Sequence, residues 1–132
     1  MVYLVHVCEG LYQALHGIEN YYISTSSFLR DIEKEAEQES LELMRSYDFI
    51  MEDLIASAEE REVSIEEEMK ENVMYCIYPV KEEFINNMSG ELNASCDLAI
   101  ILDEIGFDEF RDYYCDTALW KARNVKLKFE FF

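Results

Sequence analysis

Few residues in this chain force a turn or a break, because only four glycines and one proline occur among its 132 residues. Half of the residues are hydrophobic and 14% are aromatic. That is enough apolar side chain for one ordinary core, and it excludes a disordered acidic tail. Abundant Glu and Leu with so few breakers favour helices over a sandwich or barrel of strands. We therefore expect a single, mainly α-helical domain over residues 1–132.

The familiar motifs of catalytic and metal sites are missing. Neither of the two histidines, His6 and His16, belongs to an H-E-x-x-H or Glu-x-x-His pattern. The four cysteines, at positions 8, 76, 96 and 115, form no C-x-x-C pair and indicate buried free thiols. No P-loop, Rossmann glycine pattern or G-x-S-x-G elbow occurs. The sequence predicts no enzyme, no cofactor and no metal site; a hydrolase acting through two of the many carboxylates is the weaker alternative.

Long apolar runs are also missing. Leu98–Leu102 is among the longest, far short of the roughly 20 residues that a helix needs to cross a bilayer. The first basic residue is Arg30, and His6 interrupts the apolar start of the chain. No secretory signal is indicated. We expect a cytoplasmic protein that does not enter a membrane.

Positive charge is scarce and unevenly placed. The chain has 29 acidic residues and 11 Lys and Arg residues, a formal charge of -18. Residues 1–120 hold 28 acids and 7 bases, a net charge of -21, whereas residues 121–132 hold four bases and one acid, a net charge of +3. Such an acidic body repels nucleic acid and anionic lipid, so we expect it to bind neither directly. The partner that it would attract is a basic protein.

Apolar residues recur at helical spacing along most of the chain. The first such stretch begins at residue 4, although residues 2–7 are rich in β-branched side chains and also fit a strand. Ser64 and Glu67 form an S-x-x-E capping box at the start of a later helix, which Pro79 must kink or break. Gly106 is placed to end a helix that Asn93 can cap. The expected helices span residues 4–22, 28–57, 64–88, 93–105 and 108–122.

The C-terminal tail has a different period. Apolar and polar residues alternate there, which predicts a strand over residues 124–131. A lone strand is not stable. Its partner is therefore the N-terminal segment, a second copy in a homodimer, or the target. The predicted fold is mainly α: a bundle of about five helices with a small terminal β element.

Two acidic clusters exceed the background, one along the predicted helix 28–57 and one over residues 59–71. A solvated face that keeps the protein soluble would explain them. Self-repulsion on this scale costs folding stability, however, which favours a functional reason. Rows of carboxylates on a rigid helix can occupy the positions of phosphates and compete for a groove lined with Lys and Arg. The candidate partner-binding residues are Asp31, Glu35, Glu42, Glu52, Glu59, Glu60, Glu66, Glu67 and Glu71.

In size, charge and the acidic clusters at 31–42 and 59–71, the chain resembles the small acidic proteins with which bacteriophages inhibit host nucleases, including some anti-CRISPR proteins. The resemblance is one of class, matches no family motif and carries over no functional residue. It implies an inhibitor that binds the basic nucleic-acid-binding surface of a bacterial defence nuclease by mimicry, in a bacterial or phage-infected cell. An immunity protein that neutralises a nuclease toxin and a helical secretion chaperone or adaptor are the alternatives.

Overall fold

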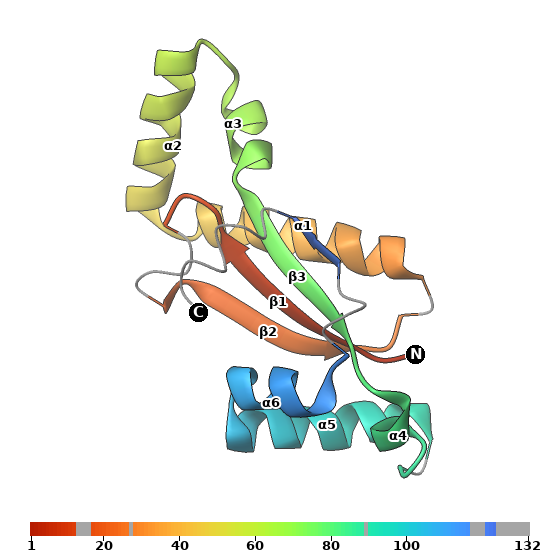
Figure 1. Cartoon of the computed structure of the whole chain (residues 1–132). Helices are drawn as coiled ribbons and strands as arrows, with labels where there is room; N and C mark the ends of the chain where they lie inside the picture. The colour runs from red at the N-terminus through yellow and green to blue at the C-terminus, as the bar shows by residue number, and fades with distance from the viewer. Residues whose placement is uncertain (13–16, 27, 89, 117–120, 124–132) are drawn as a thin grey trace.

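An antiparallel sheet lies at the centre of the fold (Figure 1). The computed structural model describes residues 1–12, 17–26, 28–88, 90–116 and 121–123. In these residues the strands are β1 (Tyr3–Glu9), β2 (Glu19–Ser24), β3 (Val73–Pro79) and β4 (Lys121–Arg123), in the spatial order β2-β1-β3-β4. The helices are α1 (Leu29–Arg45), α2 (Asp48–Arg61), α3 (Ile65–Glu71), α4 (Glu82–Ile85), α5 (Glu91–Ile105) and α6 (Phe107–Tyr114).

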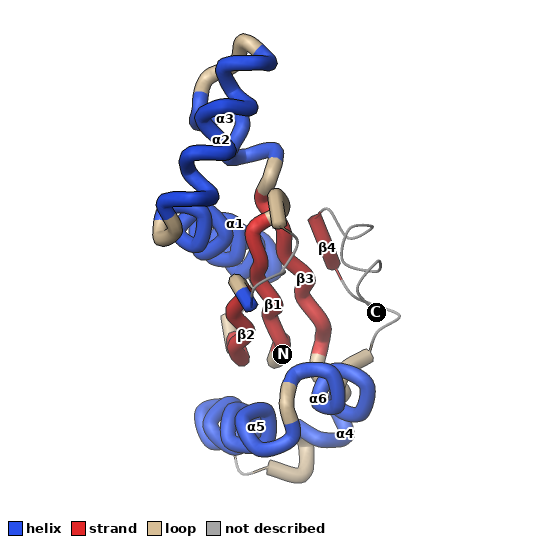
Figure 2. The backbone as a smooth tube through the Cα atoms, turned by 90° about the vertical axis from the view of Figure 1, so that its left-hand side faces the viewer, coloured by secondary structure: helices blue, strands red, loops and turns tan. Residues whose placement is uncertain are grey.

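Helices pack on both faces of the central strands, β1 and β3 (Figure 2). The odd-numbered residues of β1, such as Val5 and Val7, face α1 and pack with Ile32 and Ala36. The even-numbered side, which includes Leu4, faces α5 and α6. Because both faces of β1 and β3 are buried, their sequences read as nearly continuous apolar runs rather than as alternating ones. The second core contains Val2, Leu4, Cys76, Tyr78, Leu98, Leu102, Phe107 and Phe110.

A buried serine joins α1 to the two central strands. The Ser40 hydroxyl donates a hydrogen bond to the Cys8 carbonyl at 2.5 Å and accepts one from the Met74 amide at 3.1 Å. Cys8 and Met74 are opposite each other in the β1–β3 register. The hydroxyl therefore provides buried backbone groups of both strands with a partner.

Helices α2 and α3 form a helical hairpin that projects from the sheet, and we call residues 48–71 the acidic arm (Figure 1). Helix α2 ends at Arg61 and is followed by Glu62, whose left-handed backbone (φ 57°) lets the chain reverse. Helix α3 is capped by Ser64, whose side chain accepts a hydrogen bond from the Glu67 amide at 3.1 Å. This half of the predicted capping box is confirmed.

The prediction of a mainly α bundle is wrong, because the fold combines helices with an antiparallel sheet. The predicted helix 4–22 is replaced by β1 and β2, so the strand alternative for residues 2–7 is the one confirmed. The predicted helix 64–88 stops at Glu71 and continues as β3 and the short α4. Pro79 ends a strand instead of kinking a helix. A continuous apolar run contains matches to the helical spacing by chance, which misled both predictions.

The other expected elements differ mainly in their bounds. The predicted helix 28–57 is divided into α1 and α2 at Ser46 and Tyr47, and residues 59–61, which lie between two predicted helices, belong to α2. Gly106 ends α5 as predicted, with a φ of 86° that suits glycine. The last predicted helix is shorter, since α6 ends at Tyr114. The expected strand 124–131 lies outside the described residues. Every helix among the described residues is too short or too polar to traverse a bilayer.

Candidate functional site

The acidic arm concentrates negative charge away from the sheet. Its 24 residues contain ten carboxylates and two bases, Arg61 and Lys70, a net charge of -8. Nine of the carboxylates are exposed, and only Glu68 is buried. These exposed carboxylates lie along both helices of an arm that projects from the sheet (Figure 1). The arm can therefore create a strong negative potential for a charged partner.

One base of the arm is engaged inside it. An Arg61 Nη1 atom donates to the Glu68 carboxylate at 2.5 Å and also to that of Glu71. Glu68, whose side chain is 5% exposed, accepts a second hydrogen bond from the Ser57 hydroxyl at 2.8 Å. The hydrogen bond from Arg61 lowers the pKa of Glu71 below its usual value. This network joins α2 to α3. Because Arg61 is engaged in it, Arg61 does not neutralise the outer carboxylates of the arm.

The predicted partner-binding residues fall into two groups. Asp31, Glu35 and Glu42 lie on α1, which packs on the sheet, and the other six lie on the acidic arm. Helices α1 and α2 run in different directions on the two sides of Ser46 and Tyr47 (Figure 1), so the two groups do not form one continuous row. Asp31 is half-buried. The eight exposed ones are Glu35, Glu42, Glu52, Glu59, Glu60, Glu66, Glu67 and Glu71.

An aromatic pocket of about 440 Å³ lies at the base of the acidic arm, lined by Tyr12, Ile18, Tyr47 and Phe49. The rings of Tyr12 and Phe49 meet edge to face, with centroids 5.3 Å apart. The Tyr12 hydroxyl donates a hydrogen bond to the Asp53 carboxylate on α2, which raises the pKa of Tyr12. Aromatic faces beside a carboxylate suit the alkyl chain and cationic end of Lys or Arg. This pocket cannot be read from the sequence, because Tyr12 and Ile18 are brought to Tyr47 and Phe49 only by the tertiary fold.

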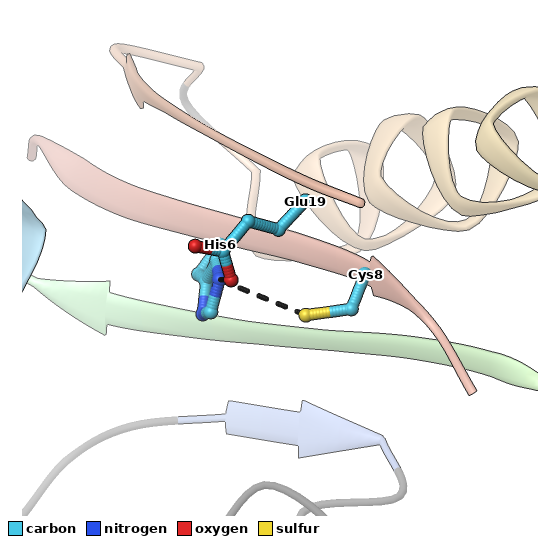
Figure 3. A group of neighbouring side chains, drawn as sticks. All are labelled: His6, Cys8 and Glu19. Carbon is cyan, nitrogen blue, oxygen red and sulfur yellow. Dashed lines mark hydrogen bonds and ion pairs between the residues drawn. The ribbon is translucent and has the colours of Figure 1, made fainter. Parts of the chain in front are cut away.

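A second cluster, formed by His6, Cys8 and Glu19, lies on the sheet (Figure 3). His6 and Cys8 are two residues apart on β1 and so point to the same face. Glu19 of β2 is directly opposite Cys8 in the register. The His6 Nε2 atom lies 3.0 Å from a Glu19 carboxylate oxygen and 3.6 Å from the Cys8 sulfur. His6 is 2% exposed, whereas the Glu19 side chain is 34% exposed.

This cluster does not activate a nucleophile. Burial raises the pKa of the Cys8 thiol, and the nearby carboxylates of Glu19 and Glu9 raise it further. A protonated thiol is a poor nucleophile. Both contacts also converge on the same ring nitrogen of His6, whereas a catalytic relay uses one imidazole nitrogen for the nucleophile and the other for the carboxylate.

The sequence alone does not reveal this cluster. The available signal was the His6-x-Cys8 spacing, which places both side chains on one face only if residues 3–9 form a strand. Glu19 could not be added without the β1–β2 register. The cluster brings together three side chains that offer a nitrogen, a sulfur and an oxygen atom as possible metal ligands.

Comparisons with known proteins give no functional assignment. No family model, no curated protein and no solved structure matches this chain.

Proposed function

We propose that this chain is a protein-binding inhibitor whose acidic arm occupies the basic surface of a nucleic-acid-binding protein. The observation that carries the proposal is the protruding arm itself, on which nine of ten carboxylates are exposed while Arg61 is held by Glu68 and Glu71. The target that we favour is a defence nuclease or nuclease complex in the cytoplasm of a bacterial or phage-infected cell. Its groove must be basic, because it binds nucleic acid.

The arm has the length and pattern that such a groove requires. Asp48, Glu52 and Glu59 are four and seven residues apart on α2, so they form one stripe along the helix. At about 1.5 Å per residue the stripe is roughly 16 Å long. This is close to five nucleotide steps of a duplex strand at about 3.4 Å each. Carboxylates in this arrangement can meet several Lys or Arg side chains that otherwise contact phosphates.

The aromatic pocket supplies the second part of the proposed interface. Charge alone steers a partner and sets its approach, whereas buried aromatic anchors usually supply most of the affinity. Tyr47 and Phe49 are 38% and 43% exposed at the start of α2, beside the first carboxylates of the stripe. We propose that one basic side chain of the target enters this pocket while its neighbours contact the arm.

The decisive experiment compares two variants with the same change in net charge, one with reversed charges on the arm and one with reversed charges on α5. The arm variant combines Glu52→Lys, Glu59→Lys and Glu60→Lys. The control combines Asp97→Lys, Asp103→Lys and Glu104→Lys, three exposed positions on α5 with the same change in net charge. Binding is measured against purified defence nucleases and nuclease toxins, with labelled nucleic acid as a competitor. We expect the arm variant to lose at least about tenfold in affinity, a change of about 1.4 kcal/mol, and the control to lose much less.

The competing outcomes are distinct. Equal losses in both variants would mean that net charge, rather than the arm, controls binding, and would refute the proposal. If nucleic acid does not displace this protein from the nuclease, then the protein binds outside the nucleic-acid-binding groove. Capture of a nuclease toxin alone would favour an immunity protein, and capture of a non-basic secreted client would favour a chaperone. Affinity should also fall as salt rises, because the Debye length is only about 8 Å at 0.15 M ionic strength.

A further inference from the structure

Three side chains with different ligand atoms converge beside β1 and β2. The His6 Nε2, a Glu19 carboxylate oxygen and the Cys8 sulfur all lie within 4.8 Å of one another. In a tetrahedral site with zinc–ligand distances of about 2.0–2.3 Å, neighbouring ligand atoms are roughly 3.3–3.6 Å apart. The observed separations of 3.0 Å and 3.6 Å from His6 Nε2 are within a few tenths of an ångström of these values. We propose that His6, Cys8 and Glu19 bind a transition-metal ion of the zinc class.

The backbone holds these ligands in place before any ion binds. His6 and Cys8 belong to the central strand β1, which is paired with β2 on one side and β3 on the other. Glu19 is fixed opposite Cys8 by the antiparallel register. Two of the three ligands are therefore on a rigid strand, which reduces the ordering cost of binding.

Aromatic packing also orients the imidazole. The ring of Phe107, at the start of α6, lies 4.3 Å from the His6 ring between centroids. Tyr21 of β2 lies 6.2 Å from the His6 ring, edge on, and 5.4 Å from that of Phe107. The guanidinium of Arg111 is 5.3 Å from the Phe107 ring centroid, on the ring's face. These contacts restrict rotation of His6 and keep its Nε2 directed at Cys8 and Glu19.

The convergence of two groups on one nitrogen favours a cation at that point. His6 Nε2 carries either one hydrogen or one lone pair, so it cannot bond well to both the sulfur and the carboxylate. An ion placed among the three atoms would accept the imidazole lone pair, the thiolate and the carboxylate together. On binding, the Cys8 S–H bond breaks, its proton goes to solvent and a sulfur–metal bond forms.

The ligand set defines the class of ion and its access. Imidazole and thiolate select zinc and similar ions over magnesium and calcium, which prefer oxygen ligands. Glu19 belongs to β2, the outermost strand on that side among the described residues, and its side chain is 34% exposed, so the site has a route to solvent. Three protein ligands leave a fourth position for water.

Cobalt(II) is the test ion, because it replaces zinc in tetrahedral sites and a bound thiolate gives it a sulfur-to-metal charge-transfer absorption. The full chain, purified reduced and treated with chelator, is titrated with Co²⁺ and then with Zn²⁺. We expect one equivalent of Co²⁺ to produce the charge-transfer band and the visible bands of tetrahedral cobalt, and Zn²⁺ to remove both. Absence of the charge-transfer band would overturn the proposal.

Variants assign the ligands. Cys8→Ser should abolish the charge-transfer band, and Glu19→Ala should keep it but weaken Co²⁺ binding by about tenfold or more. Glu19 is partly exposed, so this variant is expected to fold even if a change at buried Cys8 disturbs the sheet; circular dichroism checks both. The matched control is Cys96→Ser, an exposed cysteine on α5. Loss of the band in the control, or unchanged affinity in Glu19→Ala, would show that the three residues do not form the site.

Discussion

The buried carboxylate of Glu68 should decide whether the acidic arm is folded. Its side chain is 5% exposed and accepts a hydrogen bond from Ser57 at 2.8 Å. A hydrogen bond to a charged group contributes about 1.5–3 kcal/mol. The contact from Arg61 adds little to this sum because the guanidinium is 46% exposed, and the 3.5 Å contact from Asn72 is too long to add much. Glu68→Ala should therefore lower the free energy of unfolding by about 2–3 kcal/mol, a large part of the stability of an ordinary domain.

The measurement is urea unfolding followed by far-ultraviolet circular dichroism. Glu71→Ala is the matched control, since it removes the other carboxylate that contacts Arg61 but is 56% exposed. We expect the control to unfold nearly as the wild type does, and Glu68→Gln, which keeps the shape and loses the charge, to lie between wild type and Glu68→Ala. Equal effects of the two alanine variants, or no effect at Glu68, would refute the view that a buried network joins α2 to α3.

Three further predictions test the packing and the charge. Gly10→Ala should destabilise the fold by about 1–3 kcal/mol or more in urea unfolding, because a Cβ there would lie 2.4 Å from the Asn72 carbonyl oxygen. Phe110→Ala should cost about 3–5 kcal/mol in the same assay, since Phe110 is fully buried in the core between α6 and the sheet. Burial raises the pKa of Glu19 and of Glu39, so the folded state binds protons that the unfolded chain does not. These two carboxyls should thus add to the free energy of unfolding as the pH falls from 7 toward their ordinary pKa of 4.5, and an equal pH dependence in the wild type and in a Glu19→Gln, Glu39→Gln variant at constant ionic strength would contradict this reasoning.

Local signals in the sequence predicted the ends of some elements but not the fold. Ser64 and Gly106 act through bonds and backbone angles within a few residues, so their roles as cap and stop could be read directly. β1 could not be identified with the same certainty, because its two faces are buried by α1 on one side and by α5 and α6 on the other. Burial on both faces removes the alternation that distinguishes a strand from a helix.

Charge is the only feature of the candidate site that can be read from the sequence. The carboxylates of residues 59–71 are exposed with one exception, which is the usual place for charged side chains. The exception is Glu68, which is buried because Ser57 and Arg61 supply it with partners from the other helix of the arm. Those contacts, the aromatic pocket and the Glu19 ligand all depend on tertiary pairing, which the spacing of residues along the chain does not contain.

The loop after β1 links the acidic arm to the sheet. The Glu9 carboxylate, fully buried, accepts hydrogen bonds from the backbone amides of Leu11 and Tyr12 at 2.8 and 3.0 Å. The Gly10 amide donates to the Asn72 carbonyl just after α3, at 2.7 Å.

Tyr12 extends this link to the other helix of the arm, because its hydroxyl contacts Asp53 on α2. Both helices of the arm are thus tied to residues 9–12, which directly follow Cys8 of the proposed metal site. An ion bound there would restrain the same end of β1 that positions the arm. The two proposals remain separable, since the charge reversals on α2 leave His6, Cys8 and Glu19 intact, and the cobalt spectrum does not depend on a protein partner.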